Sequence, residues 1–280
     1  MRHRVRPGQG GKTRGVQAVI TLVTGASRGI GRGIAYSLGE AKATVYLSGR
    51  TAAGLDSAAG EIERRGGKAI PVVCDHTDDA QVEVLFNRIP ALDLLVNNVW
   101  GGYENHPNGL GMEPFWKMGM EDWDGMFTRG LRAHIAASRL AIPRMLPQGK
   151  GLIVTTIAWL SGKYLRHLYY DLAKQGCARL AYALALELKP HGIASVALAP
   201  GFVRTEAVMA AHAKHPFDLS GTESPEYIGR AVVHLARDAG MMSKSGRVLT
   251  AGDLAREYGF TDVDGKQPPA FEFPPGMALD

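Results

Sequence analysis

Short apolar runs alternate with longer amphipathic segments along most of the chain. A run that is apolar at nearly every position is typical of a strand buried on both faces of a sheet, whereas apolar residues three and four positions apart indicate a helix with one buried face. We assign strands to residues 18–23, 43–49, 69–74, 92–97, 152–158, 194–199 and 247–251. We assign helices to residues 33–41, 58–66, 78–89, 121–145 and 168–189.

This alternation predicts how the strands pair. Strands joined by a helix run parallel, and right-handed crossovers place the helices on both faces of the sheet. The sequence therefore predicts an α/β fold, a single doubly wound domain whose seven-stranded parallel sheet is flanked by helices. Ligands bind such sheets at the carboxyl ends of the strands.

The composition indicates one large domain with two appendages. The 280 residues are 45% hydrophobic, and no apolar stretch approaches the roughly 20 residues that a membrane-spanning helix needs. We expect an N-terminal arm without regular structure at 1–15, the folded domain at 16–252, and a proline-rich C-terminal extension at 253–280. The loop at 100–120, rich in glycine, proline and aromatic residues, is a candidate substrate loop.

The net charge of +5 is located in the arm. Residues 1–15 hold five of the 32 Lys and Arg residues and no acid, which leaves 27 bases against 27 acids in the rest of the chain. This balance argues against nucleic acid as a partner. The two cysteines, Cys74 and Cys177, are far apart in apolar surroundings, which favours reduced thiols and a cytoplasmic location.

Glycines cluster where the first predicted strand ends and the first helix begins. Gly25 allows a tight turn, Gly29 lets backbone N–H groups approach a pyrophosphate, and Gly31 allows the helix to pack closely on the strand. The amino end of the helix favours the anion through its dipole. The turn is typical of a Rossmann-type dinucleotide site.

Residues 24–31 (TGASRGIG) resemble the glycine-rich signature of the short-chain dehydrogenases/reductases. Further landmarks follow in that family's order over roughly residues 16–250, namely Cys74-Asp75, Asn97-Asn98 and Pro200-Gly201 after the third, fourth and sixth strands. Residues 253–265 resemble the branch called dehydrogenase/reductase family member one.

The resemblance implies a dinucleotide cofactor and the residues that hold it. Asp75 would accept a hydrogen bond from the adenine amino group, and Val203 and Thr205 would touch the nicotinamide carboxamide. The expected cofactor-binding residues are Gly25, Ser27, Arg28, Gly29, Ile30, Gly31, Arg50, Asp75, Asn97, Tyr170, Lys174, Pro200, Gly201, Val203 and Thr205. The resemblance also implies hydride transfer on the B face and a homodimer or homotetramer formed through the fourth and fifth helices.

The end of the second strand predicts which cofactor binds. An acid there would hydrogen-bond the ribose 2′-hydroxyl of NAD, but Gly49 is followed by Arg50, and Arg28 adds a second base within the glycine turn. Both arginines suit a 2′-phosphate. The sequence therefore predicts NADP(H).

Tyr170 and Lys174 resemble the family's catalytic Tyr-x-x-x-Lys pair. A spacing of four residues puts both side chains on one face of the helix that starts near residue 168. A tyrosine ionises near 10 in water, and an adjacent ammonium favours its phenolate. We expect Tyr170 to be the acid/base and Lys174 its electrostatic partner.

Two residues of the family's pattern are absent. Thirteen residues before Tyr170, where the family has a serine, this chain has Ile157, whose side chain we expect in the place of the missing hydroxyl. The family's helix-four asparagine falls near Gly130. Losing one polarising hydroxyl costs on the order of 3 kcal/mol of transition-state stabilisation. The possible replacement donors are Ser161, Thr155 and His167.

The sequence thus predicts an NADP(H)-dependent oxidoreductase that interconverts a carbonyl and an alcohol on an apolar small molecule of unknown identity. The alternative is an NADP(H)-binding sensor or scaffold whose catalysis is impaired by Ile157. No metal is expected, because His212 and His215 lack a third ligand nearby in the sequence. Loop aromatics such as Trp100 and Tyr103 are candidates for lining an apolar pocket.

Overall fold

The computed structural model describes residues 19–104, 106, 109–111, 113–158 and 163–272. Within them, seven parallel strands form one sheet in the order β3-β2-β1-β4-β5-β6-β7. The strands are β1 (Ile20–Thr24), β2 (Thr44–Gly49), β3 (Lys68–Val73), β4 (Leu94–Asn97), β5 (Gly151–Thr156), β6 (Ile193–Ala199) and β7 (Val248–Thr250). The predicted seven-stranded, doubly wound parallel sheet is confirmed.

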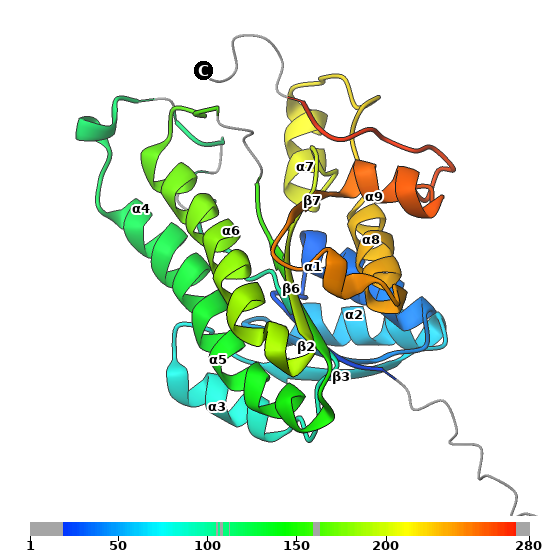
Figure 1. Ribbon diagram of the computed structural model, residues 1–280. Coiled ribbons are helices and arrows are strands. Elements are labelled where there is room, and N and C mark those ends of the chain that lie inside the picture. The colour runs from blue at the N-terminus through cyan, green and yellow to red at the C-terminus, as the bar shows by residue number, and fades with distance from the viewer. Residues whose placement is uncertain (1–18, 105, 107–108, 112, 159–162, 273–280) are drawn as a thin grey trace, which may run out of the picture.

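Helices cover both faces of this sheet (Figure 1). They are α1 (Gly29–Glu40), α2 (Ala52–Arg64), α3 (Asp79–Asn87), α4 (Glu121–Trp123), α5 (Ala133–Met145), α6 (Leu168–Leu188), α7 (Glu206–Lys214), α8 (Pro225–Arg237) and α9 (Ala251–Tyr258). A π-helical segment, Asp124–Arg132, joins α4 to α5, so the predicted helix at 121–145 changes its hydrogen-bond pattern along its length.

Alternating strand residues divide the core into two layers. Val23 and Val45 pack with α1, α2 and α8 on one face, whereas Leu22 and Leu95 pack with α3 and α5 on the other. Both faces of the central strands are therefore buried, as the nearly continuous apolar runs predict. None of the helices in the described residues is long and apolar enough to cross a membrane.

The first helix packs unusually closely on α8. A Cβ added to Gly33 would lie 2.3 Å from the backbone carbon of Pro225, so only glycine permits this contact. Ser224 caps α8 by accepting a hydrogen bond from the Tyr227 N–H, and Pro225 opens the helix. This packing fixes the glycine turn at the start of α1 relative to the sheet.

The residues that follow β7 pack against the rest of the domain. The boundary expected at residue 252 falls inside α9, which buries Leu254 in the core. Asp262 then forms an ion pair with Arg204 at 3.0 Å, joining the extension to the loop after β6. The basic arm expected at 1–15 lies outside the described residues.

Candidate active site at the carboxyl ends of the strands

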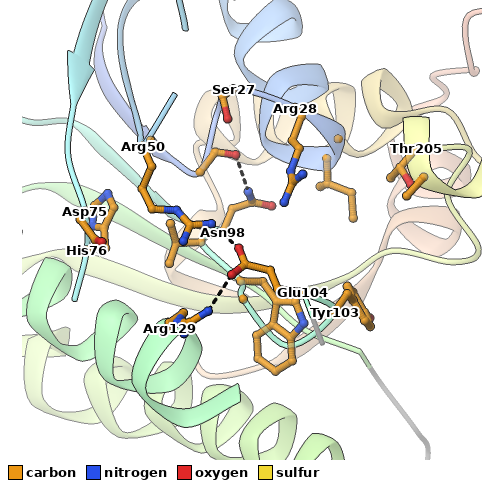
Figure 2. A pocket seen from close by; sticks show the side chains of 18 of the residues that line it. Ser27, Arg28, Arg50, Asp75, His76, Asn98, Tyr103, Glu104, Arg129 and Thr205 are labelled. Atoms are coloured by element: carbon orange, nitrogen blue, oxygen red, sulfur yellow. Dashed lines mark hydrogen bonds and ion pairs between the residues drawn. The ribbon is translucent and has the colours of Figure 1, made fainter. Parts of the chain in front are cut away.

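A cavity of about 870 Å³ opens at the carboxyl ends of β1 to β4 (Figure 2). Its lining comes from the glycine turn after β1, from the segments after β2, β3 and β4, from Arg129, and from the start of α7. The strand order reverses between β1 and β4, which is where doubly wound sheets bind their ligands.

The glycine turn needs glycine at three positions. Gly25 and Gly29 have φ angles of +68° and +57°, in the left-handed region. A Cβ on Gly31 would lie 2.3 Å from the carbonyl oxygen of Gly25, so a side chain there would separate α1 from β1. Asn98 joins the turn to β4 by donating from Nδ2 to the Thr24 carbonyl oxygen at 3.1 Å.

The carboxylate of Glu206 lies at the amino end of α1. The N–H of Gly29 donates to Glu206 Oε2 at 2.9 Å, and Arg32 forms an ion pair with the same carboxylate. The first turn of α1 thus binds an anionic oxygen, as expected for a helix amino end that is free of acidic side chains.

Arg50 is also matched by an internal anion. Glu104, from the loop after β4, forms ion pairs with Arg50 and with Arg129, the latter at 2.7 Å (Figure 2). Burial raises the pKa of Glu104, but the hydrogen bonds and charges of these two guanidinium groups leave it below its ordinary value. The guanidinium groups of Arg50 and Arg129 therefore share one carboxylate at the position where the sequence predicts that Arg50 contacts a phosphate.

The aspartate after β3 lies at the same end of the cavity. Burial raises the pKa of Asp75, but hydrogen bonds from the Thr77 N–H and hydroxyl, at 2.9 and 2.8 Å, keep it below its ordinary value. Asp75 is therefore a charged acceptor next to the cavity.

The expected cofactor residues fall into two groups. Those that line this cavity are Gly25, Ser27, Arg28, Gly29, Ile30, Arg50, Asp75 and Thr205. Those that are not among its lining residues are Gly31, Asn97, Tyr170, Lys174, Pro200, Gly201 and Val203. Asn97 is fully buried and donates to Ser138 Oγ at 2.9 Å, while its neighbour Asn98 lines the cavity.

A buried acid that the sequence analysis missed, Glu223 from the segment before α8, contacts the turn after β6. Gly201 N–H donates to Glu223 Oε2 at 2.8 Å, and Glu223 Oε1 has no partner among the described residues. Burial raises the pKa of Glu223 to about 7. A bridge between Val203 and Glu223 holds the two segments together.

Tyr170 lies in the first turn of α6 with its hydroxyl hydrogen-bonded to another tyrosine. Tyr103 Oη donates to Tyr170 Oη at 3.1 Å, and the two ring centroids are 6.1 Å apart. Tyr170 is buried, and this burial raises the pKa of its hydroxyl well above the ordinary value. Tyr103 is half exposed and lines the cavity.

Lys174 lies one turn further along α6 beneath an indole ring. Its Nζ is 3.5 Å from the centroid of Trp100, and burial lowers the pKa of the ammonium to about 8. Gly130 makes room for this ring, because a Cβ there would lie 2.7 Å from Trp100 Cζ3. The ring of Trp100 thus fills space beside the residue where the family has its asparagine.

Ile157, at the position where the family has its serine, is buried against α6. It is 3% exposed, packs with Cys177 and Ala181 of α6, and is absent from the cavity lining. Thr155 is fully buried beside Asn97 on the neighbouring strand. Ser161 lies outside the described residues.

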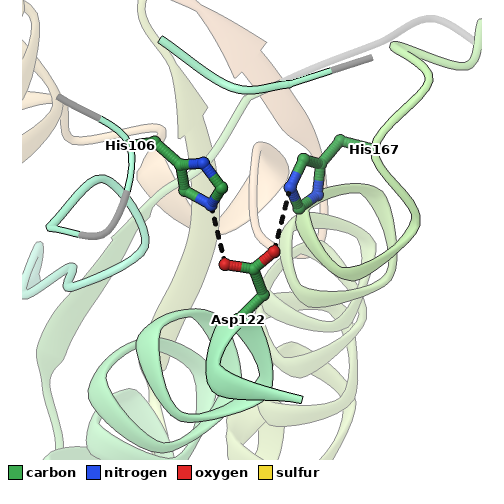
Figure 3. Close-up of side chains that lie close together, drawn as sticks. All are labelled: His106, Asp122 and His167. Carbon is green, nitrogen blue, oxygen red and sulfur yellow. Dashed lines mark hydrogen bonds and ion pairs between the residues drawn. The ribbon is translucent and has the colours of Figure 1, made fainter. Parts of the chain in front are cut away.

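His167 belongs to a cluster of two histidines and an aspartate (Figure 3). Asp122 contacts His106 Nε2 at 2.7 Å and His167 Nε2 at 3.4 Å. His167 Nδ1 accepts from the Tyr170 N–H at 3.3 Å, so the neutral ring carries its proton on Nε2 and directs it at Asp122. In this arrangement the ring has no free lone pair for a metal, and the cluster ties the 100–120 loop to the start of α6.

Sequence reasoning missed Glu104, Arg129 and Glu206 as neighbours of the cofactor residues. Each comes from a segment whose path over the cavity depends on tertiary packing. Trp100 and Tyr103 were recognised as pocket aromatics, but not as the contacts of Lys174 and Tyr170.

Comparisons with known proteins agree with this geometry. The family model for short chain dehydrogenases matches residues 19–216. The chain is 40% identical over 263 residues to mouse (Mus musculus) dehydrogenase/reductase SDR family member 1, which covers 88% of this chain and 84% of that protein. It is 27% identical over 237 residues to a 3-oxoacyl-[acyl-carrier-protein] reductase of Aquifex aeolicus, covering 80% of this chain and 92% of that protein.

A solved structure shows the same architecture with a cofactor. The crystal structure of a proposed NAD(P) dependent gluconate 5-dehydrogenase from Beutenbergia cavernae, with bound NADP, superposes with a TM-score of 0.72 at 31% identity. The match covers 84% of this chain and 96% of that chain.

Proposed function

Because the chain belongs to the short-chain dehydrogenase/reductase family, we propose that it is an NADP(H)-dependent oxidoreductase that interconverts a carbonyl and an alcohol on an apolar small molecule. One observation carries the chemistry: Tyr170 and Lys174 are buried side by side on α6. Tyr170 contacts Tyr103, and Lys174 contacts Trp100. Both of these partners line the cavity.

The residues around the cavity fit a phosphorylated dinucleotide. Glu206 and Glu104 show that the amino end of α1 and the guanidinium of Arg50 each hold an anion. The N–H groups of α1 would hold the pyrophosphate, Arg50 and Arg28 the 2′-phosphate, and Asp75 the adenine amino group. The bound cofactor would supply the hydride.

Side chains of this protein would then transfer the proton. In the direction of reduction, the Tyr170 hydroxyl gives its proton to the carbonyl oxygen, and the phenolate left behind is stabilised by the ammonium of Lys174. Burial of both groups strengthens this charge interaction, because little water screens it.

Cofactor titration tests the proposal. Each arginine contact with a 2′-phosphate is worth roughly 1.5–3 kcal/mol, so NADPH should bind at least tenfold more tightly than NADH. Arg50→Asp should remove most of that preference, whereas Arg139→Asp, on the exposed surface of α5, should not. Equal affinities in the parent protein, or an unchanged preference in Arg50→Asp, would contradict the NADP(H) assignment.

A second candidate function is an NADP(H)-binding sensor or scaffold. It is favoured by Ile157 and Gly130, which replace two residues of the family's catalytic pattern. This reading predicts tight NADPH binding without turnover of any carbonyl.

The same family membership leads us to propose a homodimer or homotetramer. Four large apolar side chains on α5 and α6 are more than 40% exposed: Ile135, Leu172, Tyr182 and Leu186. A second copy of the chain would cover them. Light scattering coupled to size exclusion should show a dimer or tetramer, and a monomer at micromolar concentration would contradict the assembly.

A further inference from the structure

We propose that Tyr103 is a second catalytic group, whose hydroxyl donates a hydrogen bond to the substrate carbonyl oxygen in place of the family's serine. The inference rests on the proposed function, because it assumes that a carbonyl is reduced beside Tyr170. It assigns a role to the one side-chain hydroxyl among the described residues that hydrogen-bonds Tyr170 Oη.

The geometry of the two hydroxyls allows both to contact one oxygen. Their oxygens are 3.1 Å apart. A carbonyl oxygen about 2.7 Å from each, an ordinary O–H···O distance, completes a nearly equilateral triangle. Tyr103 then turns its proton from Tyr170 to the substrate.

The loop that carries Tyr103 is anchored just after this residue. The adjacent Glu104 is held by Arg50 and Arg129, and His106 is held by Asp122. Asp122 also contacts His167, which caps the helix that carries Tyr170 (Figure 3). These contacts fix Tyr103 relative to Tyr170, so little reorganisation accompanies the reaction.

The other donors suggested by the sequence are less well placed. Thr155 is buried within the sheet and does not line the cavity. Both ring nitrogens of His167 are engaged, one by Tyr170 N–H and one by Asp122. Ser161 lies outside the described residues, so it enters the experiment as the rival donor.

The reaction balances with Tyr103 as a donor that keeps its proton. The hydride brings two electrons to the carbonyl carbon, and the π pair of the C=O bond moves to oxygen. That oxygen takes the Tyr170 proton and becomes the alcohol. Tyr103 hydrogen-bonds the oxygen as its charge develops and afterwards the Tyr170 phenolate, which is reprotonated from solvent.

Two measurements test the role. The first is reduction of phenanthrenequinone, an aromatic diketone suited to the aromatic lining, by the parent and by Tyr103→Phe, Ser161→Ala and Tyr170→Phe. Tyr46→Phe is the matched control, because its hydroxyl bonds the Arg88 carbonyl oxygen away from the site. Tyr103→Phe should lower kcat about a hundredfold with little change in KM, as expected for a group that acts in the transition state.

The second measurement needs no turnover. Two hydrogen-bonded phenols share the first ionisation, because whichever loses its proton is stabilised by the other. Ultraviolet titration of the cofactor-free protein should therefore show one tyrosine ionising at lower pH in the parent than in either Tyr103→Phe or Tyr170→Phe. Tyr46→Phe should titrate like the parent in this pH range.

The outcomes separate this inference from the proposed function. If Tyr170→Phe abolishes turnover while Tyr103→Phe keeps kcat within about threefold, or if Ser161→Ala alone lowers kcat, the inference is overturned and the function stands. If the two tyrosines titrate independently, the hydroxyl contact itself is wrong. If the parent binds NADPH but reduces no carbonyl, the proposed function fails.

Discussion

Glu104 forms an ion pair with Arg50, the residue that follows β2 at the end of the cavity. A cofactor phosphate and this carboxylate would compete for the same guanidinium, and their like charges would repel each other. We predict that Glu104→Gln tightens NADPH binding by about fivefold, or roughly 1 kcal/mol, and leaves NADH binding unchanged.

Isothermal titration of both cofactors checks this prediction. Glu83→Gln, on the exposed side of α3, is the matched control for removing one surface carboxylate. Weaker NADPH binding in Glu104→Gln would instead mean that Glu104 positions Arg50 for the phosphate. The proposed competition between Glu104 and the phosphate for Arg50 would then be contradicted.

The indole of Trp100 covers the ammonium of Lys174, which is one of the expected cofactor-binding residues. A cofactor that reaches Lys174 must shift this ring, so we predict that NADP⁺ changes the tryptophan fluorescence of the parent. Trp100→Phe should lose most of the change, whereas Trp116→Phe, whose side chain is largely exposed, should keep it. An undiminished change in Trp100→Phe would show that the ring stays in place.

The buried ammonium of Lys174 should lower the free energy of unfolding of the cofactor-free protein. Burial lowers its pKa from 10.5 to about 8, so between these values the unfolded state binds more protons and the free energy of unfolding rises with pH. We predict that Lys174→Met is more stable than the parent by about 1–3 kcal/mol at pH 7, because a charged buried group is removed. The advantage should shrink as the pH rises through 8 toward 10.5.

Urea unfolding at several pH values measures the effect. Lys189→Met, at the exposed end of α6, controls for the loss of one lysine. A stability difference that does not vary with pH, or a destabilised Lys174→Met at pH 7, would show that the ammonium is better solvated than its burial indicates.

The fold was predictable because each strand is a continuous apolar run and each connecting helix has one apolar face. The glycine turn was predictable for a related reason: Gly25, Gly29 and Gly31 each meet a local backbone requirement that the sequence states directly. The positions of Tyr170 and Lys174 on one helical face followed from a spacing of four residues.

The contacts between loops were not predictable. Tyr103 meets Tyr170 only because Glu104 and His106 fix the path of the loop between β4 and α4, and no local rule sets that path. The packing of Ile157 was not predictable for a similar reason. Counting from Tyr170 gives its position in the chain but not the direction of its side chain, which packs into the core against Cys177.

We propose above all that the chain transfers a hydride from NADPH to a carbonyl, with Tyr170 as proton donor. The test uses NADPH deuterated at the B-face hydrogen of the nicotinamide and follows the label by mass spectrometry, with acetophenone as acceptor, because its alcohol product keeps the transferred hydrogen on the carbinol carbon. We expect deuterium on the carbinol carbon of the product, formed at a rate that falls at least a hundredfold in Tyr170→Phe. Deuterium retained on the oxidised cofactor, or a Tyr170→Phe rate within a few-fold of the parent, would contradict it.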